Sequence, residues 1–154
     1  MGQSWVFQAN PKRFDIDAFL NERPKGVSWI TPQSSDQMSV GDIVYIWRSK
    51  AGGPDYRSGV IAACIIEEPP IERSDDPNTA HYWMTDEDRD VVRKRVELSI
   101  RSIYQRVSPI RSEALADDAL SKCEFVKGRQ QTNFLLTSET AQKLAAYAER
   151  VPKR

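Results

Sequence analysis

The chain has 154 residues, of which 40% are hydrophobic, and its 22 Lys and Arg residues balance 22 Asp and Glu residues. This length predicts one domain over residues 1–154, which can bury a core without disulfides or a structural metal. Zero net charge excludes a global basic field for nucleic acid, although it is compatible with a basic patch on one face.

The cysteines and the hydropathy indicate where the chain functions. Its two cysteines form no CxxC motif, which favours a reduced, cytoplasmic protein. No apolar run approaches the roughly 20 residues that a membrane span requires, so we expect no membrane contact.

The first half of the chain predicts strands around one short helix. "SWVFQA" (4–9) is aromatic and β-branched, which favours a strand. Asp15 is a typical helix cap, and the apolar spacing after it predicts a helix that ends before Pro24. Two further strands are predicted at 27–31 and, after the turn "VGD", at 43–49.

The second half begins with an apolar run at 59–68, which is typical of a buried strand. Residues 69–90 are rich in proline and acids, and they predict a long irregular segment with at most one helical turn, capped by Thr85 and Asp88. Alternating apolar residues predict a half-exposed strand at 96–100, with its arginines on the outer face. The remaining expected elements are a short helix at 112–120, a strand at 132–136 and a helix capped by Ser138.

Short turns between the strands and the absence of βαβ alternation predict an α+β fold. We expect a small, curved, mostly antiparallel sheet or β-barrel with a few peripheral helices.

Five segments, in this order and spacing, resemble a known family. They are "WVFQANPKRF", "GVSWITPQSS", "VGDIVYIWRSK", "SGVIAACII" and "GRQQTNFLLTSE". The chain resembles the EVE domain of the PUA-like superfamily, a relative of the YTH domains. The resemblance implies a small β-barrel with a cleft beside it that holds a modified base of DNA or RNA. It also implies a separate effector protein as a partner, because the chain has no room for a nuclease.

The resemblance also implies a set of residues that line the cleft. Trp29 matches the stacking wall, and Tyr56 or Trp83 is a candidate to complete the aromatic cage. The other matched positions are Gln8, Ala9, Asn10, Ile30, Trp47, Arg48, Arg129, Gln130, Thr132 and Asn133.

The chemistry of these residue types agrees with the resemblance. A reader of one base must sandwich it against an aromatic face and hydrogen-bond its edge with Asn, Gln or backbone groups. Because stacking alone gives about 1 to 3 kcal/mol, phosphate contacts must add affinity, and Arg95, Arg101 and Arg129 are our candidates for them.

Each candidate residue has a structural alternative. Trp5 and Trp47 are typical core residues, and Trp29 is as compatible with a core as with a cleft wall. The arginines can form a solvated strand face, and Asn133 can be a turn residue. If Trp29 stacks, its truncation will weaken binding with little loss of stability.

Catalysis has little support in the sequence. His81 is the one histidine, no nucleophile motif accompanies it, and "DEDRD" lacks the spacing of a calcium loop. We therefore expect a non-catalytic protein without metal or cofactor. The alternative function is a protein- or small-molecule-interaction module that uses the same cleft without nucleic acid. The sequence leaves the oligomeric state open.

Overall fold

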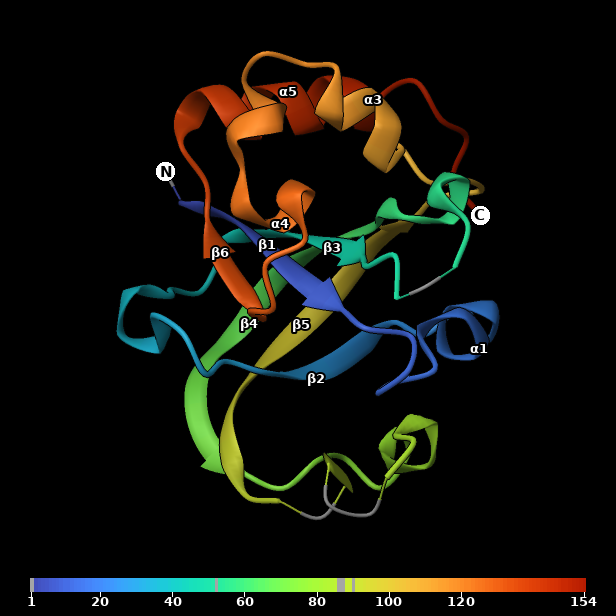
Figure 1. Ribbon diagram of the computed structural model, residues 1–154. Coiled ribbons are helices and arrows are strands. Elements are labelled where there is room, and N and C mark those ends of the chain that lie inside the picture. Colours follow the sequence, from blue (N-terminus) through green and yellow to red (C-terminus); the bar gives the residue numbers. More distant parts are fainter. Residues whose placement is uncertain (1, 52, 86–87, 90) are drawn as a thin grey trace.

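The computed structural model of the protein describes residues 2–51, 53–85, 88–89 and 91–154. One six-stranded sheet, in the order β2-β5-β4-β3-β1-β6, forms its centre (Figure 1). The strands are β1 (Ser4–Ala9), β2 (Gly26–Ile30), β3 (Ile43–Arg48), β4 (Gly59–Arg73), β5 (Arg93–Ile103) and β6 (Asn133–Leu135).

The pairing of the strands confirms a mostly antiparallel sheet. β1 runs parallel to β3, and the four other pairs of neighbours are antiparallel. The sheet is strongly curved, but the pairings of the described residues do not join its edge strands β2 and β6, so the expected closed barrel is not confirmed. The α+β class with peripheral helices holds.

Side-chain hydrogen bonds, rather than backbone pairing, connect the two edge strands β2 and β6. Asn133 on β6 donates from Nδ2 to the Ile30 carbonyl at the end of β2, at 3.2 Å. Its Oδ1 accepts from the Gln33 amide at 3.1 Å, while Gln33 Oε1 accepts from the amides of Thr132 and Asn133, both at 3.0 Å. This Gln33–Asn133 clamp holds the two edges together at the end of β2 and the start of β6.

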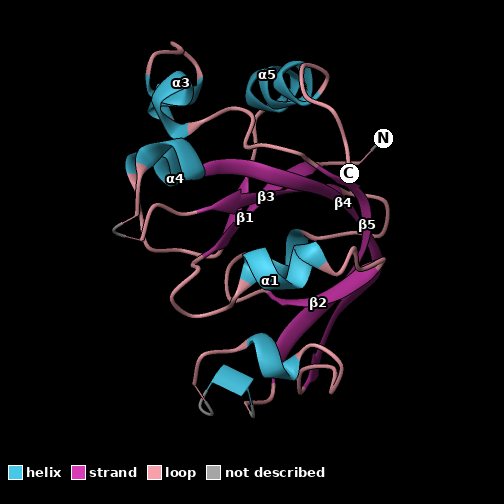
Figure 2. Cartoon of the chain, turned by 90° about the vertical axis from the view of Figure 1, so that its right-hand side faces the viewer, coloured by secondary structure: helices cyan, strands magenta, loops and turns pink. Residues whose placement is uncertain are grey.

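The sheet carries an apolar core on each face. The alternation in β3 sends Val44 and Ile46 into one core and Tyr45 and Trp47 into the other, as expected for a central strand. Figure 2 shows α3 (Arg111–Leu115), α4 (Glu124–Lys127) and α5 (Ser138–Ala148) over one face, and α1 (Ile16–Asn21) with β2 towards the other.

The predicted cap of the first helix is confirmed. Asp15 Oδ1 accepts from the Ala18 amide at 3.1 Å. Phe14, just before the cap, packs edge-on against Phe19 with 5.6 Å between ring centroids. These two contacts fix the direction in which the chain leaves β1, and they place Phe14 beside the end of β2.

β4 and β5 are longer than predicted. The two prolines of "EEPPIER" suggested that the strand ends at 68, yet β4 continues to Arg73. Its register against β5 shifts between Ile66 and Glu68 and again between Glu68 and Ile71. These irregularities accommodate residues that lack an amide donor, because bulges are where a strand tolerates proline.

The other differences lie at helices. α3 ends at Leu115, well before the expected limit, and α4 was not predicted because one turn leaves no periodic signal. The cap of α5 is Thr137 rather than Ser138, since Thr137 Oγ1 accepts from the Thr140 amide at 3.2 Å. None of the helices in the described ranges is long and apolar enough to cross a membrane.

The segment after β4 contains the expected helical cap. Thr85 Oγ1 accepts from the Asp88 amide at 3.2 Å. Three acidic residues of "DEDRD", at 86, 87 and 90, lie outside the described residues.

Candidate functional site

A cleft of about 330 Å³ opens where β1 and β2 end. The chain segments after both strands, the loop before β6 and the start of β5 converge on it. Its lining residues are Gln8, Ala9, Asn10, Arg13, Phe14, Trp29, Ile30, Pro32, Gln33, Trp83, Arg93, Gln130, Gln131 and Thr132. The structure thus brings together eight of the predicted residues: Gln8, Ala9, Asn10, Trp29, Ile30, Trp83, Gln130 and Thr132.

Three aromatic side chains form one wall of the cleft. Phe14 lies between the two tryptophans, edge-on to Trp29 at 5.7 Å and edge-on to Trp83 at 4.9 Å between centroids. Trp83 is half-buried, so part of its indole faces solvent. Such a wall offers apolar surface to a flat ligand.

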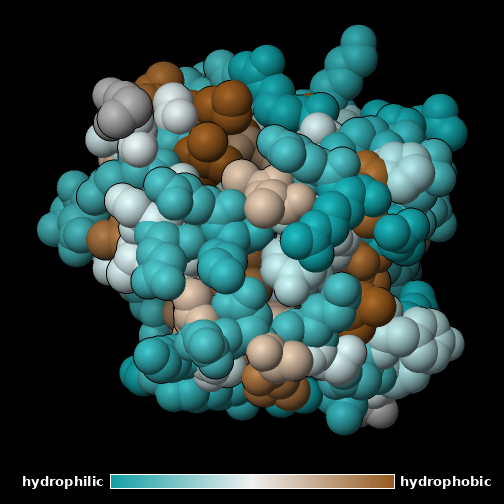
Figure 3. All heavy atoms as spheres, turned by 90° about the horizontal axis from the view of Figure 1, so that it is seen from above, coloured by the Kyte–Doolittle hydropathy of each residue, from teal (hydrophilic) through white to brown (hydrophobic). Residues whose placement is uncertain are grey.

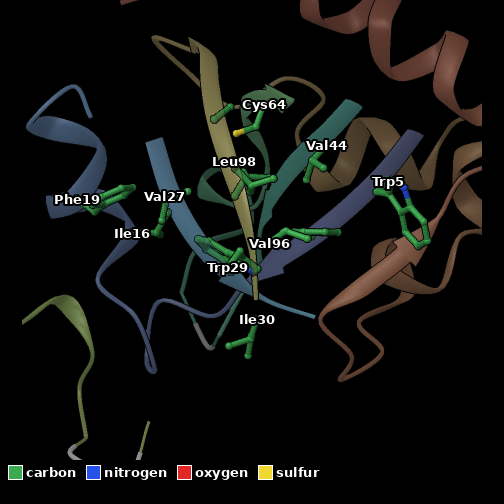
Figure 4. Packing of buried hydrophobic residues seen from close by; sticks show 14 of the residues in the cluster. Trp5, Ile16, Phe19, Val27, Trp29, Ile30, Val44, Cys64, Val96 and Leu98 are labelled. Atoms are coloured by element: carbon green, nitrogen blue, oxygen red, sulfur yellow. The ribbon is translucent and has the colours of Figure 1, made fainter. Parts of the chain in front are cut away.

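Trp29 belongs to the core as well as to the cleft. Only 6% of the residue is exposed, and Figure 4 shows it with Val27, Val96 and Leu98 in the core of this face of the sheet. The expectation that Trp29 stacks without supporting stability is therefore wrong. The strand end does point the indole at the cleft, but β5 and Phe14 cover most of it.

Trp83 is fixed by buried polar groups. Its indole Nε1 donates to Asp75, whose other oxygen accepts from Thr79 Oγ1 at 3.0 Å. The Arg95 guanidinium lies 6.0 Å from the Trp83 ring centroid and 3.9 Å from Asp75. These contacts hold the second tryptophan against the cleft.

The assignment of Arg95 to phosphate binding is corrected. Its side chain is fully buried, because residues 75–83 cover the outer face of β5 at this point. Burial is the main reason that the pKa of Arg95 lies below its ordinary value, an effect that Asp75 opposes. Arg95 is a structural cation that supports Trp83.

Amide side chains also line the cleft. Gln8 Nε2 donates to the carbonyls of Arg129 and Gln131, at 3.1 and 3.0 Å. Asn10 Oδ1 accepts from the Lys12 amide at 2.9 Å, which leaves the Asn10 NH₂ group to donate elsewhere. Asn133 is 1% exposed and is not among the lining residues; it acts through the Gln33–Asn133 clamp.

Two arginines lie at the cleft and share one carboxylate. Arg13 donates to both oxygens of Asp88, at 3.2 and 2.6 Å, and Arg93 approaches the same group at 3.5 Å. The Arg13 hydrogen bonds hold the pKa of Asp88 below its ordinary value, and they raise the pKa of Arg13 in return. Among the residues that the structure describes, two arginines thus share one carboxylate on this side of the cleft.

Other predicted residues lie outside the cleft. Trp47 is 1% exposed and packs on Phe125 at 5.1 Å, and Arg48 is buried against Asp17 at 3.0 Å. Tyr56 is exposed beside Arg48 on another part of the surface. None of these three residues lines the cleft. Phe125 of α4 covers Trp47, and Asp17 of α1 forms an ion pair with Arg48.

The remaining phosphate candidates are exposed, but their side chains are not in the cleft. Arg101 pairs with Glu67 at 3.2 Å on the outer part of β5. Arg129 contributes its carbonyl to Gln8, and its side chain is exposed beside the cleft.

The sequence interpretation missed six cleft residues: Arg13, Phe14, Pro32, Gln33, Arg93 and Gln131. The first four lie within four positions of a predicted cleft residue, just after β1 or β2. The signal was the position itself, because the segments that follow β1 and β2 meet at the cleft, although three strands separate β1 from β2 in the sheet.

Groups suited to catalysis do not converge on the cleft within the described residues. His81 is exposed and lies against Tyr82, with 4.0 Å between ring centroids. Burial raises the pKa of the Cys64 thiol to about 12, so this thiol is a poor nucleophile. No cluster of ligands suited to a metal ion occurs among the residues that the structure describes.

Solved structures share this fold. A protein of Pseudomonas putida is 18% identical with a TM-score of 0.63, over 94% of this chain and 98% of that one. A Leishmania major protein is 20% identical with a TM-score of 0.63, over 97% of each chain. Human THYN1, solved in complex with DNA that contains 5-methylcytosine, is 16% identical with a TM-score of 0.62, over 98% of this chain and 100% of that one.

Sequence comparison gives the family. No curated protein sequence matches the chain. The family model described as the EVE domain matches residues 3–147, which is most of the chain. The chain therefore belongs to the EVE domain family.

Proposed function

We propose that this protein binds DNA that carries a modified base and holds that base, flipped out of its strand, in the cleft. The observation that carries the proposal is that the aromatic side chains of Phe14, Trp29 and Trp83 and several amide side chains line one cleft of about 330 Å³. This volume lies at the lower end of the roughly 300–1,000 Å³ of small-molecule sites, which suits a single base.

Each part of the cleft has a role in this proposal. The exposed part of Trp83 stacks on the base, and Trp29 and Phe14 close the apolar end. Asn10, Gln8 and Gln33 hydrogen-bond its polar edge, as readers of unstacked bases do. Arg13 and Arg93 attract the phosphates beside the base. Binding of 5-methylcytosine DNA by human THYN1, which shares the fold, supports this assignment.

The proposal is non-catalytic, since a cleft of aromatic and amide groups selects and orients a base. The alternative is a protein- or small-molecule-interaction module that uses the same cleft without nucleic acid. A module that docks proteins needs a contiguous apolar patch. Figure 3 shows mostly hydrophilic residues on the face seen from above, with hydrophobic residues in small groups, so this face offers no such patch.

Titration of single-stranded DNA oligonucleotides tests the proposal. Strands with cytosine, 5-methylcytosine and other modified bases, together with matched RNA strands, are compared by fluorescence anisotropy. We expect one modified DNA strand to bind more tightly than its unmodified counterpart. Trp83→Ala should weaken that binding by about 1 to 3 kcal/mol.

Tyr56→Ala is the matched control, because Tyr56 is an exposed aromatic residue outside the cleft. It should leave the affinity unchanged. Equal affinity for modified and unmodified strands, or equal losses in the two variants, would remove base capture from the account.

A further inference from the structure

A second cavity of about 210 Å³ adjoins the cleft. Gln8, Asn10 and Gln130 line both, so these amide side chains form the ridge between them. We call the second cavity the side cavity. A chain that leaves the cleft over this ridge enters the side cavity directly.

The charge of the side cavity is positive. Lys50 and Arg111 line it, and no carboxylate is among its described lining residues. Lys127 and Arg129, both exposed, flank Gly128 at its edge. Arg111 is anchored by Asp55 at 3.2 Å and by the Val126 carbonyl at 3.1 Å, whereas Lys50 has no ion-pair partner among the residues that the structure describes.

The lining also distinguishes between possible ligands. The aromatic residues at its base, Trp47 and Phe125, are 1% and 2% exposed, and they pack against each other. They therefore offer almost no face on which a base could stack. Amide, hydroxyl and cationic groups remain, and these are the partners of a phosphate or sugar.

We propose that the side cavity binds a phosphodiester group of the strand. This group joins the nucleotide whose base lies in the cleft to the next nucleotide. The inference rests on the proposed function and adds to it a path for the strand. Between the base in the cleft and the phosphate in the side cavity, the strand crosses the ridge of Gln8, Asn10 and Gln130. Lys50 supplies the charge that is free to neutralise this phosphate, and Arg111 supplies a second, fixed donor.

The test compares two ligands with and without the phosphate. One is a single strand with the preferred modified base, and the other is the corresponding free nucleoside. Lys50→Gln should weaken binding of the strand and leave binding of the nucleoside unchanged. It should also reduce the slope of log K against log salt for the strand by about 0.7, the value of one contact on a single strand.

Lys25→Gln is the control variant. Lys25 is an exposed lysine at the far end of β2, about 16 Å along the strand from Ile30. It should change neither the affinity nor the salt slope. In NMR titrations the Gly128 amide should shift with the strand and stay in place with the nucleoside.

The outcomes separate the two proposals. If the strand and nucleoside both bind while Lys50→Gln keeps the full salt slope, the side-cavity proposal is wrong and the base cleft stands. If neither ligand binds the parent protein, both proposals are wrong. Trp83→Ala should weaken binding of both the strand and the nucleoside, whereas Lys50→Gln should weaken binding of the strand alone. This difference distinguishes loss of the contact with the base from loss of the contact with the phosphate.

Discussion

Two tryptophans of the cleft differ in how much of each is committed to the core. Trp29 is 6% exposed and lies among core residues, whereas Trp83 is half-buried and is held at the rim by Asp75. The same residue type thus has a mainly structural role at one position, whereas at the other the proposed function gives it a mainly binding role.

Truncation of the two tryptophans should separate these roles. We expect Trp29→Ala to lower the free energy of unfolding by about 3 to 5 kcal/mol, because it leaves a large cavity in the core. Trp83→Ala should lower the free energy of unfolding less than Trp29→Ala does, and it should weaken binding of the modified strand more. Urea denaturation of both variants checks this, and a Trp29→Ala protein as stable as the parent would contradict it.

Arg95 should be important for stability although it contacts no ligand. Its removal leaves Asp75 buried without its cation, and breaking a buried pair costs about 3 to 5 kcal/mol. Arg95→Ala should therefore destabilise the fold by this order. Arg101→Ala is the control, because its exposed pair with Glu67 should contribute less than about 1 kcal/mol. Similar denaturation midpoints for the two variants would show that Arg95 is not a structural cation.

At the scale of elements, the Gln33–Asn133 clamp takes the place of barrel closure. It connects the end of β2 to the start of β6, and the segment before β6 forms part of the cleft. The clamp therefore couples the integrity of the sheet to the geometry of the cleft.

Asn133→Ala should loosen this coupling. It leaves the buried Ile30 carbonyl without this partner, at a cost of about 1 to 3 kcal/mol, and it frees the half-buried Gln33 amide at a smaller cost. Hydrogen exchange of the Gln33 and Thr132 amides should become faster. Leu135→Ala, at an exposed position of the same strand, is the control. Unchanged exchange in Asn133→Ala would show that the clamp has no such role.

The sequence predicted elements whose signals are local. The six strands and the cap at Asp15 follow from alternation and capping. The predicted cleft residues at the ends of β1 and β2 came from the resemblance to the EVE domain. Arg95 was misassigned because alternation placed it on the outer face, which a distant segment covers. The sequence left open whether Trp47 belongs to the core or to the cleft, because Phe125, which packs over it, is 78 positions away. Contacts between distant segments are invisible to local patterns.

At the scale of the whole molecule, zero net charge conceals a local imbalance. Arginine or lysine lines both the cleft and the side cavity. Among the described residues, Asp88 partly offsets Arg13 and Arg93, and Asp55 pairs with Arg111. Balanced composition therefore does not argue against an anionic ligand.

Asp88 should make stability depend on pH in the acid range. Its pKa is lowered in the folded protein, chiefly by hydrogen bonds from Arg13, so the unfolded chain binds the proton more tightly. The stabilisation is complete above the ordinary Asp pKa of about 4 and is lost as pH falls through the lower folded value. Asp88→Asn should be less stable than the parent at neutral pH, and the difference should shrink below about pH 4. A constant difference would contradict the assignment.

The four tryptophan indole N–H signals in an NMR spectrum test the central claim most directly. Trp83 and Trp29 line the cleft, whereas Trp5 is buried, and its Nε1 donates to Asp42 at 3.0 Å, away from the cleft lining. On titration with the preferred modified strand, we expect the Trp83 signal to shift most, Trp29 to follow and Trp5 to stay in place. Binding that leaves the Trp83 and Trp29 signals unmoved would contradict the capture of a modified base in this cleft.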